Sequence, residues 1–117
     1  VLYAYIILGF SLNWIFTPDT AAADFGFILK DLADNAQNAL LRDFTSFFVA
    51  TLIFVLLGVV TLNPTWFFSA GIIYICAAIF NLTAVLIHGT EYNLIYVGEI
   101  FLGLWPIFLG ITILIKR

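Results

Sequence analysis

The stretch Phe44–Leu62, with the sequence FTSFFVATLIFVLLGVVTL, sets the class of this protein. Its nineteen residues carry no charge. A helix of that length rises 1.5 Å per residue and covers the roughly 30 Å hydrocarbon core of a bilayer. Arg42 and Asp43 stand directly before the stretch, and the helix-breaking pair Asn63-Pro64 follows it. The sequence therefore predicts a membrane-spanning helix over residues 44–62.

The composition of the whole chain agrees with a membrane environment. Apolar residues make up 64% of the 117 residues and charged residues 9%, and the mean hydropathy is +1.16. Soluble domains average roughly 45–50% apolar and about 25% charged residues. Backbone exposed to lipid satisfies its own hydrogen bonds only in helices or closed barrels. Residues 44–62 and 94–115 lack the period-two alternation of barrel strands, so we expect an all-α protein.

Three further apolar runs predict spans over residues 1–16, 66–88 and 93–115. The first is short, about 24 Å if straight, but no basic region precedes it, so we interpret it as a span and not as a signal peptide. The connections at 63–65 and 88–93 are tight, which makes neighbouring spans antiparallel. The predicted fold is a single-domain, integral membrane, antiparallel four-helix bundle.

An amphipathic helix is expected between the first and second spans, over residues 25–43. Apolar residues recur there at helical spacing, and aspartates and asparagines fall on the opposite face. This helix would lie along the membrane surface, cover one end of the bundle, or run into the second span with a bend near Arg42. Residues 17–43 hold five aspartates against Lys30 and Arg42, which argues against binding of anionic lipid headgroups.

Polar residues of the predicted spans collect at one end of the bundle. Antiparallel spans place six of them within roughly 10 Å of one membrane interface: Asn13, Arg42, Asp43, Asn81, His88 and Glu99. Glu99 needs an explanation, because an acid costs about 2.5 kcal/mol or more at the centre of a span. Arg42 is the first candidate partner, followed by His88 and Asn81. The cluster either sets helix register through an interhelical bridge or lines a pocket for a small ligand or a proton.

Other chemistry has little support in the sequence. His88 is an alternative ligand for the metal of haem or chlorophyll, although a single histidine excludes bis-histidine ligation within the chain; we expect no cofactor. Cys76 is the only cysteine, so no disulfide forms within the chain. Four basic residues and a net charge of −3 exclude a nucleic-acid partner. No HExxH, CxxC or glycine-rich phosphate loop is present, and we expect no enzyme activity.

Four short motifs resemble a family of small bacterial four-span membrane proteins. They are Phe16-Thr17-Pro18 closing the first span, Asn38–Asp43 opening the second, His88-Gly89-Thr90 closing the third, and Glu99 in the fourth. That family is defined only as a domain of unknown function and is distantly similar to DoxX-like proteins. The resemblance implies the four-span architecture and no reaction. Phe80-Asn81 stands here where the family tends to have Gly-Arg in the third span.

Two functions remain open on the sequence. Thirteen Phe, five Tyr and three Trp, together with a repeat of Ala70, Ala77 and Ala84, favour helix-packing surface and hence an accessory subunit of a larger membrane complex. The alternative is an autonomous binder or transporter of a small lipophilic or protonatable molecule. A partner-facing side should be aromatic and rich in small residues, whereas an autonomous protein should show aliphatic residues to lipid all round.

The expected location is a bacterial inner membrane or an organelle membrane, with several passes through the bilayer. The predicted topology puts Lys116 and Arg117 on one side and Lys30 and Arg42 on the other. Orientation follows the count of cations on each side, and these counts are equal. The concentration of two cations at the carboxyl end favours cytoplasmic termini.

Overall fold

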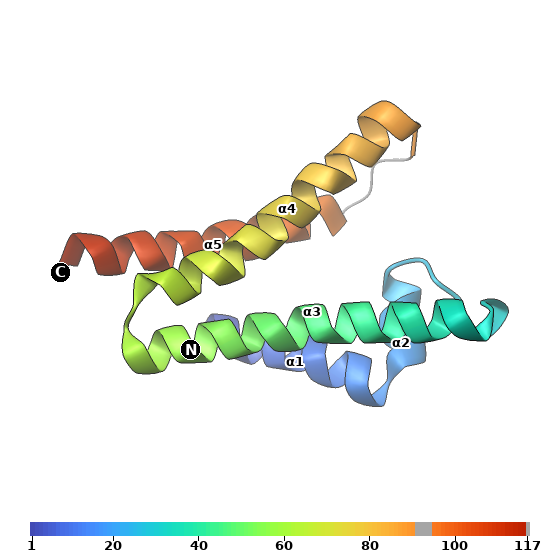
Figure 1. Cartoon of the computed structure of the whole chain (residues 1–117), viewed down its shortest axis with the longest axis horizontal. Helices are drawn as coiled ribbons and strands as arrows, with labels where there is room; N and C mark the ends of the chain where they lie inside the picture. The colour runs from blue at the N-terminus through green and yellow to red at the C-terminus, as the bar shows by residue number, and fades with distance from the viewer. Residues whose placement is uncertain (91–94, 117) are drawn as a thin grey trace. The chain divides into compact units, whose positions relative to one another are not determined.

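The computed structural model describes residues 1–90 and 95–116, which are almost entirely helical (Figure 1). The elements are α1 (Leu2–Phe16), α2 (Pro18–Asp24), the 3-10 turn η1 (Leu29–Asp31), α3 (Asp34–Thr61), α4 (Pro64–His88) and α5 (Ile95–Lys116). The predicted all-α class is confirmed. The predicted start of the fourth span at Asn93, the connection before it and Arg117 lie outside the described residues.

Within the described residues, three helices are long and apolar enough to cross a membrane: α3, α4 and residues Val97–Lys116 of α5. This supports the predicted membrane protein. α1 is also apolar but has 15 residues, which makes it about 22 Å long. The first of the four predicted spans therefore stays a prediction.

Residues 25–43 do not form the separate amphipathic helix that the sequence predicted. α2 ends before them, because Gly26 adopts a left-handed φ of +87°. The N–H of Phe27 then donates to the carbonyl of Ala22 at 2.9 Å, and the N–H of Gly26 donates to Ala23 at 2.9 Å. This pair of bonds is a Schellman ending, which glycine favours because it lacks a Cβ. Helix resumes at Asp34, and the polar residues that follow are the first turns of α3.

The predicted turn between the second and third spans is confirmed at Asn63. Its side chain accepts a hydrogen bond from the Thr65 N–H at 3.1 Å, and Pro64 takes the first helical position of α4. Proline suits that position because its missing N–H would have no helical partner there. α4 then runs to His88, the predicted end of the third span, where Gly89 with a φ of +72° caps it.

The chain forms two compact units, Val1–Ile53 and Phe54–Arg117, and α3 contributes its first part to one and its last part to the other. In the first unit α1 lies antiparallel to α3. The rings of Phe10 and Phe48 are 5.5 Å apart and those of Trp14 and Phe44 are 4.8 Å apart. α1 buries residues at helical spacing on one side: Tyr3, Ile7, Ser11 and Trp14.

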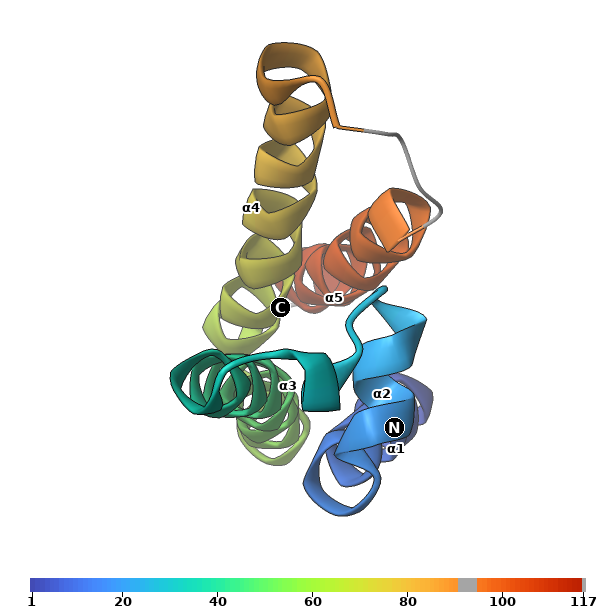
Figure 2. The same cartoon turned by 90° about the vertical axis from the view of Figure 1, so that its right-hand side faces the viewer.

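The second unit is built on an antiparallel hairpin of α4 and α5. Glycines allow the two helices to approach closely: a Cβ on Gly110 would lie 2.7 Å from the Phe68 ring, and one on Gly71 would lie 2.7 Å from the Gly103 carbonyl oxygen. Figures 1 and 2 show α4 and α5 side by side near the start of α4 and diverging towards its end.

Candidate functional site

Asn81 of α4 and Glu99 of α5 form the polar contact of the α4–α5 hairpin. The Asn81 Nδ2 donates to the Glu99 Oε1 at 2.8 Å, and both side chains are half-buried. Glu99 follows the first turn of α5, and Asn81 lies seven residues before His88, the last residue of α4. The contact continues the antiparallel register of the glycines and joins the later part of α4 to the early part of α5.

Within the second unit, the partner that the structure gives Glu99 is the amide of Asn81. Among residues 1–90 and 95–116 the one salt bridge joins Arg42 Nε to Asp43 Oδ1 at 2.9 Å. A carboxyl group in an apolar helix pair needs a donor when ionised, and a protonated carboxyl is itself a donor and an acceptor. The Asn81 amide can serve both forms, because it carries both kinds of group. The pair is therefore suited to a carboxyl that gains and loses a proton.

The other predicted site residues make local contacts. Arg42 and Asp43 are neighbours on α3, and their side chains are 71% and 66% exposed. A pair so accessible to solvent adds little to stability. Arg42 and Glu99 belong to different units, so the bridge predicted between them stays a prediction.

Asn13 and His88 lie at helix ends. The Thr17 hydroxyl donates to both the carbonyl oxygen and the side-chain oxygen of Asn13, which closes the last turn of α1. His88 is exposed at the end of α4. The structure thus joins Asn81 to Glu99 and Arg42 to Asp43, and the predicted six-residue cluster stays a prediction as a whole.

Metal-binding potential is low in the part of the chain that the structure describes. No group of three or more His, Cys, Asp or Glu side chains there could hold a metal ion. His88 and Cys76 are both exposed on α4. Ligation of haem or chlorophyll by His88 stays an untested alternative.

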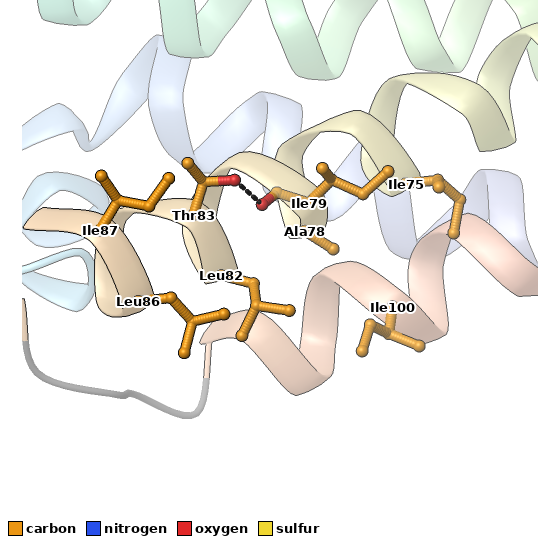
Figure 3. A pocket seen from close by; sticks show the side chains of 8 residues that line it. All are labelled: Ile75, Ala78, Ile79, Leu82, Thr83, Leu86, Ile87 and Ile100. Atoms are coloured by element: carbon orange, nitrogen blue, oxygen red, sulfur yellow. Dashed lines mark hydrogen bonds between the residues drawn. The ribbon is translucent and has the colours of Figure 1, made fainter.

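A shallow apolar groove of about 280 Å³ runs along α4 beside α5 (Figure 3). Seven residues of α4 line it, among them Ile75, Leu82 and Leu86, and α5 contributes Ile100. The polar group in the lining is the Thr83 hydroxyl, which donates to the Ile79 carbonyl at 2.9 Å within α4. The groove therefore suits an alkyl group. The residues that line the groove recur at helical spacing. A stripe of lipid-facing residues has the same spacing, so the groove could not be predicted from the sequence.

The motifs behind the family resemblance lie mostly at helix ends. Phe16-Thr17-Pro18 joins α1 to α2, and His88-Gly89-Thr90 ends α4. Asn38–Asp43 lies inside α3, which begins at Asp34. Compared with known proteins, the chain matches no family model, no curated protein and no solved structure.

Proposed function

We propose that the protein is a multi-pass integral membrane subunit that supplies helix-packing surface to a larger membrane complex. The observation that carries this proposal is an exposed aromatic edge on α5. Phe101 and Phe108 are 58% and 61% exposed, and the rings of Phe101 and Trp105 are 5.4 Å apart. Gly98 precedes them on the same edge, with no atom within 4 Å of where its Cβ would stand.

The exposed surface of α5 is divided by residue type. Positions 98, 101, 105 and 108 are spaced by three and four residues, so they lie along one edge of the helix. The neighbouring edge is aliphatic and exposes Leu104, Ile111 and Leu114. α3 exposes mostly aliphatic residues of its apolar run, as lipid contact requires: Ile53, Leu56, Leu57, Val59 and Val60. Aromatic side chains are exposed on other helices too, among them Tyr5, Phe16 and Phe80, but on α5 they stand in one row beside a glycine with open space around it.

Aromatic rings beside an open glycine suit a second helix better than they suit lipid. Transmembrane helices associate through close packing, and a glycine lets the partner's backbone approach. Offset or edge-to-face ring pairs add about 0.5–1.5 kcal/mol each beyond the burial of area. The partner that fits this edge is a membrane-spanning helix of another protein.

The proposed architecture within that complex has four spans. α1 is apolar, lies antiparallel to α3 and has its carboxyl end beside the first apolar residues of α3. Its 15 residues are about 22 Å long. A span this short is accommodated by local thinning of the bilayer or by association with other helices, which agrees with a subunit inside an assembly.

Photo-crosslinking in the native membrane tests the proposed subunit role. A photoreactive amino acid replaces Phe101 or Phe108 in one set of variants and Leu104 or Ile111 in the control set. We expect the first set to give a discrete crosslinked band with one membrane protein and the control set to react mainly with lipid. Reaction of both sets with lipid alone would contradict the proposal.

A second candidate function rests on the Asn81–Glu99 contact, and it is an autonomous binder or transporter of a small protonatable molecule or a proton. An ionisable side chain within a span commonly marks such a path. Glu99→Gln keeps an acceptor for Asn81 but cannot ionise. In sealed vesicles with a pH-sensitive dye, this candidate requires the wild-type chain to dissipate a pH gradient and the Gln variant not to. Equal rates in the two would remove it.

A further inference from the structure

The segment Phe25–Ile28, called here the Phe25–Ile28 loop, exposes apolar side chains although it is not part of a long helix. Ile28 is 58% and Phe27 36% exposed, whereas the next residue, Leu29, is buried. The backbone of the loop is fixed at both ends. The Schellman bonds tie Phe27 to Ala22 on one side, and the N–H of Asp31 donates to the carbonyl of Ile28 at 3.1 Å on the other. The two apolar side chains are therefore held outward by a defined turn.

Ring contacts within the first unit set the position of the loop along α1 and α3. The Phe25 ring lies 6.0 Å from Trp14 and 5.0 Å from Phe44. The Phe27 ring lies 6.2 Å from that of Phe44. Phe44 is the first residue of the uncharged stretch of α3, and Trp14 precedes the end of α1 by two residues. The loop thus packs beside the residue at which the apolar stretch of α3 begins.

The chemistry of the loop matches the boundary between water and hydrocarbon. Residues 25–29 are uncharged and apolar, and the exposed charges of Asp24, Lys30 and Asp31 bracket them. Interfacial segments bury Phe and Leu side chains at the boundary between headgroups and acyl chains, and a flanking lysine can extend its ammonium group towards water. The neighbouring aspartates make anionic headgroups unfavourable, so neutral or zwitterionic lipid is the better partner.

We propose that the Phe25–Ile28 loop is a membrane anchor, which inserts Phe27 and Ile28 into the interfacial layer of the bilayer. The loop would fix the depth of the connection between α1 and α3 and hold their ends at one interface. The inference requires α3 to cross the bilayer. It does not depend on the accessory-subunit role, because it concerns lipid and not a protein partner.

A fluorescence experiment on the full chain in phosphatidylcholine vesicles tests the anchor. Cys76→Ala removes the one native cysteine, and Ile28→Cys is then labelled with an environment-sensitive dye. The matched control is Asn35→Cys, an exposed position in the first turn of α3. Both positions are exposed, so neither change removes a core side chain, and circular dichroism checks that the helix content is retained. Quenchers are aqueous iodide and lipids with a nitroxide near the headgroup or near the chain end.

The anchor predicts a blue-shifted emission at position 28, several-fold stronger quenching by the shallow nitroxide than at position 35, and protection from iodide. Iodide quenching equal to that at position 35 would overturn the proposal. Shielding from both iodide and nitroxide would overturn it too, because protein and not lipid would then cover the loop. Stronger quenching by the deep nitroxide would contradict the interfacial depth. The vesicles contain no other protein, so failure here is distinct from failure of the subunit proposal.

Discussion

At the scale of single residues, the Asn81–Glu99 hydrogen bond shows what residue counting can and cannot predict. Counting from the helix ends predicted that Asn81 and Glu99 lie at similar depth, and the structure joins them at 2.8 Å. Counting named Asn81 only after Arg42, which was preferred for its charge and whose bridge to Glu99 stays a prediction. The choice depends on which way each side chain points around its helix. That rotation is set by close packing along the whole hairpin.

Replacing Asn81 by Leu should weaken the hairpin, because Glu99 then loses its donor inside an apolar helix pair. Interhelical hydrogen bonds in membranes contribute about 0.6 kcal/mol on average and up to about 1.7 kcal/mol, and we expect a loss of stability in that range. The measurement is the free energy of unfolding in mixed micelles. Glu99→Gln should change it little, since the Gln oxygen still accepts from Asn81.

The control for Asn81→Leu is Thr83→Val, two residues along α4. The Thr83 hydroxyl bonds only within its own helix, to the Ile79 carbonyl, so no contact between helices is lost. An equal loss of stability in both variants would show that the Asn81–Glu99 bond does not join the hairpin.

At the scale of elements, the small residues that matter in the hairpin are glycines. The sequence indicated a seam of Ala70, Ala77 and Ala84 from their seven-residue spacing. Ala70 is buried, but Ala77 and Ala84 are only half-buried. Gly71 and Gly103 let the two backbones come close together, since a Cβ on Gly71 would lie 2.7 Å from the Gly103 carbonyl oxygen. The spacing of small residues in the sequence reveals a stripe on one helix. Close approach of two helices also depends on which small residues of the second helix face that stripe.

Gly71→Ala should separate α4 from α5. The added Cβ would lie 2.7 Å from the backbone oxygen of Gly103 and 2.5 Å from the Ile107 side chain, and backbone cannot move aside as a flexible side chain can. Overpacking of this kind costs about 1–3 kcal/mol, measurable as a lower free energy of unfolding. Gly98→Ala is the control, because nothing lies within 4 Å of its Cβ position. Destabilisation by Gly98→Ala of the same size would contradict the packing described for the hairpin.

The ending of α2 gives a second prediction at this scale. Gly26→Ala meets no neighbour within 4 Å, but its φ of +87° is strained for an L side chain. We expect a loss of about 1 kcal/mol, because the left-handed region costs roughly 1–2 kcal/mol for alanine and a stiffer unfolded chain returns part of that. Gly9→Ala within α1 should instead leave stability unchanged or raise it by about 0.5–1 kcal/mol. Thermal unfolding followed by circular dichroism compares the two, and a stabilising Gly26→Ala would contradict the Schellman ending.

At the scale of the whole molecule, the features of the sequence that best predicted the fold were its long, uncharged apolar stretches. Residues 44–62 and 66–88 predicted two helices that the structure contains within α3 and α4, and Asn63-Pro64 predicted the turn between them. The connector was predicted less well. Apolar spacing continued across the turn at Gly26, so periodicity alone joined residues that belong to a loop and to α3. Trp14, near the end of the first predicted span, is buried against Phe44, because its ring fills the space between α1 and α3.

The proposed function also concerns the whole molecule, because an accessory subunit is defined by the membrane proteins that it binds. The aromatic edge of α5 with its open glycine is the surface that the proposed partner would cover. Apolar composition alone does not indicate such a partner, since lipid and protein both accept apolar side chains. The division of α5 into an aromatic and an aliphatic edge supports the proposed partner, because ring packing against a second helix would account for it.

The most direct measurement is the native mass of the protein after gentle extraction from its own membrane. The proposed subunit role predicts that the chain is released within an assembly several times heavier than its own 13.1 kDa, together with at least one other membrane protein. Replacing Phe101 and Phe108 by Leu should weaken that assembly, whereas Leu104→Ile and Ile111→Leu should not. Release of the wild-type chain alone, or as a small oligomer of identical chains, would contradict the subunit role and leave the Asn81–Glu99 pair as the place to look for a ligand.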